Sequence, residues 1–475
     1  MLFNSREFVV FLPVVLAVYY LLPHRGQNWF LLAASCFFYA SWDWRFLAPL
    51  LFSTTIDYFC ARQMASSILR GEAPSARKRY LALSLVTNLG LLGFFKYFDF
   101  FAGSLQRLFG ELGWSIQPWT LQLILPIGIS FYTFQALSYT IDVYRGEIHA
   151  TRHFWDFLLC VIYFPHLVAG PIQRARSLLP QVALPRKIRR DQLIEGLHLI
   201  LWGYFQKVYI ADNMGAATSW IYSLPNPPGF LTLIGMYSFA VQIFCDFSGY
   251  TDIARGIAKL MGFEFMLNFN LPYFAANPQE FWERWHISLS TWFRDYLYIP
   301  LGGNRKGTAR TYVNLMVTML IAGLWHGAAW HFVLWGAYHG VLLAAHRLLK
   351  PVLGRITFVS AILQGAWRAV RVLFMFQLTC LGWLIFRAGS TAALAGMLAS
   401  LFHGIHITDM PLLIRVATLA APLLVVQCIQ GLSGKLSFLD FRWIPAELRA
   451  AVYSTFVYFI LFHGGPPRAF IYFQF

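Results

Sequence analysis

Long apolar runs with few charges recur along the whole chain, and short polar segments separate them. A helix needs about 20 mostly apolar residues to cross a bilayer. Runs of this kind predict membrane spans near 7–22, 29–42, 44–61, 80–102, 120–142, 153–170, 193–211, 229–247, 311–326, 328–346, 366–388, 411–431 and 450–463. Because several are short or polar, the pattern predicts an all-α polytopic membrane protein with about 11 crossings plus re-entrant half-helices. No soluble domain fits between them, so residues 1–475 are expected to form one integral membrane domain with an aromatic tail at 464–475.

The first apolar run is expected to be a retained span. Residues 1–7 lack the basic stretch that opens a signal peptide. The run that follows contains Pro13 and has no small-residue cleavage site, so it reads as the first of the membrane helices.

Three loops carry an excess of Lys and Arg, at 62–79, 172–190 and 303–310. Loops of this charge stay on the cytoplasmic side of a membrane, so all three are expected there.

The first two of these loops create a conflict of parity. The three candidate spans between them would leave the chain on the wrong side of the membrane, so one of the three does not cross. The run 153–170 is the best choice, because Pro165 and the Gly170-Pro171 pair interrupt it. Broken backbone at membrane depth survives only where protein or a water-filled cavity shields it. The sequence therefore predicts a re-entrant element beside a buried cavity.

Composition agrees with a lipid environment. Hydrophobic residues make up 58% of the chain and charged residues only 12%, whereas soluble domains carry about a quarter charged residues. The net charge of +16 lies in the loops and fits the orientation rule for membrane proteins, so no nucleic-acid partner is expected. The six cysteines are scattered and form no CxxC pair, which predicts buried thiols without disulfides or metal.

The polar segment 277–303 is predicted to be one helix. Asn277 suits its N-cap, Pro278 its first position and Glu280 its third, while Pro300 with two following glycines ends it. Glu280 and Arg284 are four apart and can pair. Such a polar and aromatic helix fits the wall of a polar tunnel, and the alternative is an interfacial amphipathic helix without chemistry.

An uncharged window at 311–346 contains His326 near its middle, at a predicted break between Gly323 and Gly327. An ionisable residue at that depth is a functional candidate, with a hydrogen-bonded structural histidine as the alternative. His331 and His339 share the window. His326 and His331 are five apart, on different helix faces, and there is no HExxH motif, so no metal is expected. The chain also lacks the Gly-x-Ser-x-Gly elbow of serine hydrolases.

Several motifs together resemble the bacterial branch of the membrane-bound O-acyltransferase family. The resemblance covers nearly the whole chain, and it is carried by LPIGISFYTFQ at 125–135, IDVYRG at 141–146, LVAGPI at 167–172, DFSGYTD at 246–252, the segment 272–303 and GLWHGA at 323–328. It implies a ring of helices around a central funnel, with re-entrant helices inside. It also implies that His326 is the buried active-site histidine, and that His286, in a Trp-His-Ile-Ser motif, lies close to it.

The resemblance further implies a function. The expected activity is the transfer of acetyl groups from cytoplasmic acetyl-CoA across a bacterial inner membrane for O-acetylation of an exported polysaccharide, with alginate as the first expectation. Extracytoplasmic esterase-like acetyltransferases are the expected partners. A D-alanyl carrier protein stays open as the donor, and peptidoglycan or cellulose as the acceptor. A non-catalytic acyl conduit or scaffold and a transporter are the alternatives from other functional classes.

Roles for individual residues follow from this expectation. His326 would act as general base, as suits an imidazole near neutral pH, and His286, oriented by Glu283, would polarise the carbonyl or relay the proton. The phosphates of acetyl-CoA would bind at Arg305, Lys306 and Arg310. The tunnel wall is expected to contain Glu283, Arg284, Trp285, Trp325, Asp295 and Asn314.

The C-terminal end, Phe470 to Phe475, adds a candidate acyl carrier. It is similar to a Phe-x-Tyr-x-x-Phe pattern in a small partner protein of the D-alanylation system, which implies that Tyr472 holds the acyl group. A phenol has a pKa of about 10 and a thiol about 8.5, whereas the pKa of a sugar hydroxyl is far higher and closer to that of water. Transfer from thioester to phenol ester is thus nearly balanced, and onward transfer to sugar is favourable. The alternative is an aromatic anchor at the membrane interface.

Overall fold

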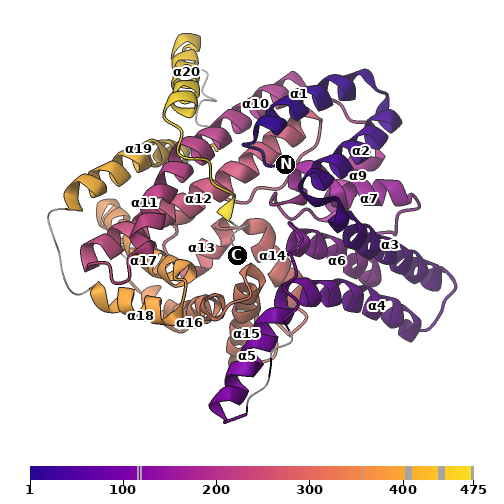
Figure 1. The fold of residues 1–475 in the computed structure, drawn as a ribbon, viewed down its shortest axis with the longest axis horizontal. Helices are drawn as coiled ribbons and strands as arrows, with labels where there is room; N and C mark the ends of the chain where they lie inside the picture. The colour runs from indigo at the N-terminus through magenta and orange to yellow at the C-terminus, as the bar shows by residue number, and fades with distance from the viewer. Residues whose placement is uncertain (115–116, 118–119, 357, 402–408, 437–443, 472–475) are drawn as a thin grey trace. The chain divides into compact units, whose positions relative to one another are not determined.

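A computed structural model describes the chain except for residues 115–116, 118–119, 357, 402–408, 437–443 and 472–475 (Figure 1). Throughout the described part, the regular elements are helices and there is no strand. The helices form two compact units. The first unit comprises Met1–Leu197 and Ala254–Met266, and the second comprises His198–Ile253 and Leu267–Phe475.

The first unit is built from helices of very different length, from the four residues of α8 to the continuous helix Pro74–Glu111. They are α1 Arg6–Leu21, α2 His24–Asp43, α3 Leu47–Leu69, α4 Pro74–Leu92, α5 Phe98–Glu111, α6 Ile129–Arg145, α7 Phe154–Ile162, α8 Phe164–Leu167, α9 Ala175–Ala183 and the first half of α10 Arg190–Tyr204. A π-helical turn at Gly93–Tyr97 joins α4 to α5, so the span predicted at 80–102 is part of one continuous helix, Pro74–Glu111.

The second unit holds the remaining helices. They are α11 Asp212–Ser223, α12 Gly229–Leu260 up to Ile253, α13 Pro278–Arg284, α14 Ile287–Phe293, α15 Thr308–His326, α16 Trp330–Leu353, α17 Ala361–Arg387, α18 Thr391–Ser400, α19 Met410–Ser433 and α20 Ala446–Phe462. A π-helical segment, Phe205–Ala211, connects α10 to α11.

The chain is a polytopic membrane protein. Among the described residues, five helices are long and apolar enough to cross a membrane by length and composition, namely Pro74–Glu111, Gly229–Leu260, Trp330–Leu353, Ala361–Arg387 and Met410–Ser433. Large apolar side chains point outward on them, as at Leu373 and Phe374, which are 63% and 65% exposed. Lipid covers such surfaces in a membrane protein. The total of about 11 crossings stays a prediction.

The predicted break in the run 153–170 is confirmed. Helix α7 has 9 residues, which span about 13.5 Å at 1.5 Å per residue, and this is too short to cross. The chain turns at Tyr163, two residues before Pro165, and resumes as the four-residue α8. Gly128, at the start of α6, has a positive φ of 77°, and a Cβ there would lie 2.7 Å from the carbonyl oxygen of Leu167. Only glycine therefore allows α6 to begin so close to this broken element.

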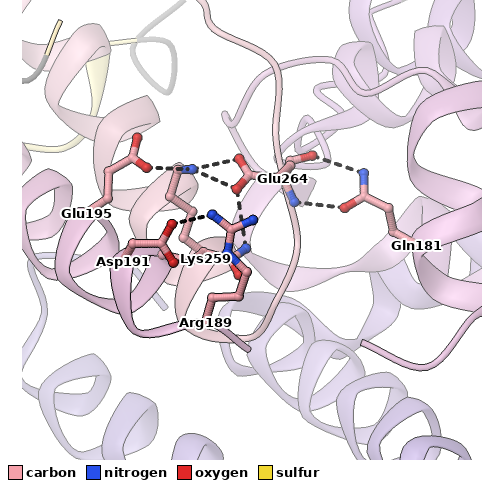
Figure 2. Close-up of polar contacts among 7 residues, drawn as sticks. Gln181, Arg189, Asp191, Glu195, Lys259 and Glu264 are labelled. Carbon is pink, nitrogen blue, oxygen red and sulfur yellow. Dashed lines mark hydrogen bonds and ion pairs between the residues drawn. The ribbon is translucent and has the colours of Figure 1, made fainter. Parts of the chain in front are cut away.

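A polar cluster fastens the loop ends of the first unit (Figure 2). Lys259, in the last turn of α12, pairs with Glu195 at 3.1 Å and with Glu264 at 2.7 Å. The side chain of Gln181 bridges to the backbone of Glu264 by donating to its carbonyl at 3.1 Å and accepting from its N–H at 2.8 Å. These contacts hold part of the predicted basic loop 172–190 against the residues that follow α12.

The expectation of one helix over 277–303 is wrong, although its start is as predicted. The side chain of Asn277 accepts a hydrogen bond from the Glu280 N–H at 2.9 Å, with Pro278 at the first position. The helix then stops after Arg284, because Trp285 is extended and His286 has a positive φ of 43°.

The break at His286 has a tertiary cause. The Asn270 N–H donates to the Arg284 carbonyl, and the Ile287 N–H donates to the Asn268 carbonyl, both at 2.9 Å. The side-chain oxygen of Asn268 also accepts from the Ser288 N–H at 3.2 Å. The segment before the helix thus satisfies the backbone groups that the break exposes, and this pairing outweighs the local preference for a continuous helix.

Candidate functional site

His286 lies at the junction of α13 and α14 and is completely buried. Its ring meets the edge of Phe247 with 4.6 Å between centroids, and Trp325 lies at 5.9 Å. Burial lowers the pKa of His286 to about 3, because an apolar environment disfavours the charged imidazolium. The imidazole is therefore neutral near pH 7, with one nitrogen that donates and one that accepts.

His326 is the last residue of α15 and is 3% exposed. The predicted break follows it directly, since Gly327 is extended and α16 begins at Trp330. Trp335 and Phe386 form aromatic walls around the imidazole, with centroids at 5.0 and 5.5 Å.

Two glycines allow α15 and α16 to approach closely around His326. A Cβ at Gly323 would lie 2.2 Å from the Phe332 carbonyl oxygen, and one at Gly336 would lie 2.3 Å from that of Met319. Small residues at such a crossing let helix backbones pack closely in membrane proteins. The position of His326 thus depends on the absence of side chains at its own helix crossing.

The two breaks bring His286 and His326 together. Their ring centroids are 6.5 Å apart, with the rings inclined by 55°. This separation lets two imidazoles act on one small reacting group. The aromatic surroundings exclude water, which strengthens hydrogen bonds and charge interactions at such a centre.

A pocket of about 980 Å³ opens beside this pair in the second unit, a volume in the upper range for ligand sites. Its lining includes Ile287, the neighbour of His286, and Ala322, one turn before His326. Its wall has apolar and polar parts, formed by Gln279, Trp282, Glu283, Leu289, Ser290, Thr291, Phe293, Arg294, Tyr298, Asn304, Leu315, Thr318, Met319, Leu343, His346, Arg347, Lys350 and Pro351.

Of the residues expected in a tunnel wall, Glu283 lines this pocket. It accepts a hydrogen bond from Gln279 at 2.9 Å. The break in the helix removes the spacing by which Glu283 was expected to orient His286. Trp285 and Trp325 are buried: Trp285 packs on Phe281 at 5.7 Å, and Trp325 contacts both histidines, with ring centroids at 5.9 Å from His286 and 5.1 Å from His326.

The other three expected tunnel residues make structural contacts outside the pocket lining. Arg284 forms the predicted pair with Glu280 at 2.8 Å. Asp295 pairs with its neighbour Arg294 at 2.8 Å. Asn314 is buried and donates to the Gly303 carbonyl at 2.9 Å, so it fastens α15 to the preceding loop.

The basic residues expected to hold phosphates are exposed on the loop before α15 and in its first turn. Arg305, Lys306 and Arg310 are not part of the pocket lining, whereas Arg294, Arg347 and Lys350 are. Sequence reasoning missed the latter pair on α16. The available signal was the return of positive charge immediately after the uncharged window 311–346.

The candidate carrier Tyr472 lies outside the described residues, but the tail before it is described. Phe470 and Ile471 are buried in the second unit. The Phe470 ring contacts Tyr250 at 4.8 Å and Phe247 at 5.6 Å. Since Phe247 also contacts His286, a single aromatic ring connects the tail to the histidine pair.

Within the described part of the chain, no group of three or more His, Cys, Asp or Glu side chains could hold a metal ion. All six cysteines are free thiols.

Comparison with known proteins identifies the family. The sequence profile of the membrane-bound O-acyltransferase family matches residues 27–385. A probable alginate O-acetylase of Azotobacter vinelandii is 42% identical over 404 residues, covering 85% of this chain and 78% of that protein. A peptidoglycan O-acetyltransferase of Helicobacter pylori is 36% identical, covering 82% and 77%. A teichoic acid D-alanyltransferase of Bacillus subtilis is 28% identical, covering 56% and 69%. The chain therefore belongs to the membrane-bound O-acyltransferase family and is an acyltransferase.

Proposed function

We propose that this protein takes acetyl groups from cytoplasmic acetyl-CoA and passes them across the bacterial inner membrane for O-acetylation of an exported polysaccharide, alginate in the first place. The observation that carries the proposal is the buried pair His286 and His326, 6.5 Å apart, beside a pocket of about 980 Å³ with a partly basic wall. The relatives named as alginate O-acetylases support the acetyl group and the polymer.

The chemistry at the pair is acyl transfer by general base catalysis. An acceptor hydroxyl approaches His326, which removes its proton while the oxygen attacks the thioester carbonyl. The carbon–sulfur bond then breaks, and the departing thiolate takes up the proton from His326, so CoA leaves as a thiol. His286, being neutral, donates one hydrogen bond to the developing oxyanion. General base catalysis of this kind contributes about 10²- to 10⁴-fold to a rate.

The pocket is suited to the donor. The acyl-bearing arm of acetyl-CoA is thin and partly apolar and would lie along Leu289, Leu315 and Met319 toward the pair. Its phosphates would bind Arg294, Arg347 and Lys350 in the wall. The exposed residues Arg305, Lys306 and Arg310 would add positive potential near the mouth and attract the anionic donor.

The first acceptor is Tyr472 or a residue of an extracytoplasmic partner. The position of Phe470, one aromatic ring from His286, supports an acceptor on the C-terminal tail. A tyrosyl ester keeps enough transfer potential to acetylate a sugar hydroxyl, because a phenol is a much better leaving group than an alcohol. Esterase-like acetyltransferases outside the membrane would complete the transfer to the polymer.

Peptidoglycan is an alternative acceptor polymer, and one specific observation supports it. The peptidoglycan O-acetyltransferase of Helicobacter pylori is nearly as similar in coverage as the alginate relatives. The donor and the histidine chemistry would be the same, and only the extracytoplasmic partner and the polymer would differ.

The proposal is tested with inside-out membrane vesicles that contain the protein and acetyl-CoA labelled in the acetyl group. We expect label to appear on the protein or a co-expressed partner, and an excess of unlabelled acetyl-CoA to reduce the amount of label incorporated. If labelled D-alanyl carrier protein transferred its label and acetyl-CoA did not, the donor would be the carrier protein and not acetyl-CoA. If neither donor transferred label, the proposed catalytic function would be wrong and a scaffold role would be the remaining interpretation.

A further inference from the structure

A buried ionic cluster lies where the C-terminal tail passes into the second unit. The ammonium group of Lys207 is 2.7 Å from a carboxylate oxygen of Asp246 and 2.9 Å from one of Asp212. The three side chains are 5%, 4% and 3% exposed. Charges are rarely buried so completely unless they serve a paired and specific arrangement.

The tail backbone supplies further partners of this cluster. Lys207 donates a third hydrogen bond to the Arg468 carbonyl at 3.1 Å. The other carboxylate oxygen of Asp246 accepts from the Ile471 N–H at 2.7 Å. Two of the three charged groups therefore hold backbone atoms of the tail, three residues apart, and fix both its path and its direction.

The tail is also held where it leaves α20. The Gly465 N–H donates to the Val208 carbonyl at 2.9 Å, within the π-helical segment that carries Lys207. The side chain of Asn213 donates to the His463 carbonyl at 2.9 Å. A Cβ at Gly465 would lie 2.4 Å from the Asn213 nitrogen, so only glycine permits this approach.

These contacts end beside the reaction centre. Ile471 is the last described residue, and the ring before it, Phe470, contacts Phe247, which in turn contacts His286 at 4.6 Å. Residues 464–470 form no regular helix or strand, so no secondary structure of their own holds them in place. Its position depends on the groups that bind it.

We propose that Lys207, Asp212 and Asp246 form a tail clamp, and that Lys207 and Asp246 are positioning residues that hold the tail from Arg468 to Ile471 within one aromatic ring of His286 for acyl transfer. The positional half of the proposal stands on the contacts above. The half that concerns acyl transfer rests on the proposed function. The clamp acts through the tail backbone, and it depends on its own charges.

The position of the tail is measured first, by the reaction of a cysteine at residue 471 with N-ethylmaleimide. The variant Ile471→Cys is made in a background with Cys36→Ser and Cys428→Ser, since these are the two cysteines that are not buried. In the otherwise native protein the new thiol is protected. We expect its labelling rate to rise tenfold or more when the clamp is opened.

Two independent variants open the clamp. Gly465→Ala pushes the tail away at its start without touching a charge. The triple change Lys207→Met, Asp212→Asn and Asp246→Asn removes all three charges of the cluster together, so none of the three is left buried without its partner. The matched controls are Gly389→Ala, where a Cβ meets nothing within 4 Å, and Lys259→Met, which breaks the ionic cluster of the first unit (Figure 2).

The kinetic result separates positioning from general stability. With the tail clamp opened, we expect kcat for acetyl transfer to fall tenfold or more while KM for acetyl-CoA is unchanged, because the donor pocket is intact. Both controls keep native labelling and kcat. Unchanged labelling in both clamp variants would overturn the clamp, and raised labelling with native kcat would overturn its role in transfer. His326→Ala keeps residue 471 protected but loses transfer; if it retained transfer, the proposed function would fail while the labelling still reported on the clamp.

Discussion

The imidazole rings of His286 and His326 lie 6.5 Å apart, and each occupies the point where a helix is interrupted. A helix break leaves backbone groups without helical partners, so it persists in a membrane protein only inside a shielded interior. Both breaks are shielded here by aromatic rings, including Phe247 and Trp335. The pair is thus built from two local irregularities that the surrounding packing supports.

The helix crossing that places His326 should not tolerate a methyl group. Gly323→Ala puts a Cβ 2.2 Å from a backbone oxygen, and overpacking of this kind costs about 1–3 kcal/mol. We expect a lower melting temperature in detergent and a loss of acetyl transfer. The control is Gly365→Ala, where a Cβ meets nothing within 4 Å, and which should keep both. Equal melting temperatures and equal acetyl transfer in the two variants would contradict the close crossing of α15 and α16.

The burial of His286 predicts a particular pH dependence of stability. The pKa of His286 in the folded protein is about 3, against an ordinary 6.5. Between these two values the imidazole is protonated in the unfolded chain but stays neutral in the folded protein. No stability is lost above pH 6.5. As the pH falls from 6.5 toward 3, the free energy of unfolding falls progressively.

Replacing the imidazole should remove this loss. Melting temperatures of wild type and His286→Asn are compared at pH 7.5 and 5.5, and we expect the variant to lose less on acidification. An equal loss in both proteins would mean that His286 can be protonated in the folded state.

The pocket wall and the exposed loop offer two sites for the phosphates of the donor, and they can be separated. We expect Arg347→Ala with Lys350→Ala to raise KM for acetyl-CoA by about tenfold or more, since a hydrogen bond to a charged group contributes about 1.5–3 kcal/mol. The pair Arg305→Ala with Lys306→Ala should act weakly, and its effect should disappear in high salt. A larger rise in KM for the loop variant than for the pocket variant would mean that the phosphates bind at the loop.

The sequence predicted the features that depend on local chemistry. The N-cap at Asn277, the break after His326 and the broken run around Tyr163 all follow from residue types at fixed spacing, namely a capping amide, a glycine and prolines. The membrane class followed from apolar runs, and the catalytic candidate His326 followed from an ionisable residue within such a run.

The features that the sequence did not predict depend on contacts between distant segments. The break at His286 arises from pairing with Asn268 and Asn270, and propensity alone favours a continuous helix there. The tail clamp joins Lys207 to residues near the end of the chain. In the sequence these charged residues stand among apolar neighbours and read as parts of ordinary membrane spans. Their role as partners of the tail is seen only in the contacts of the folded chain.

The most direct test of the central claim is polymer acetylation in cells that carry His326→Ala in place of the native protein, with expression and membrane insertion matched. We expect acetylation to fall by about 10²- to 10⁴-fold, the range of general base catalysis. His331→Ala, a histidine of the same region that is only partly buried, serves as the control and should retain acetylation. Full acetylation with His326→Ala would contradict catalysis at the buried pair.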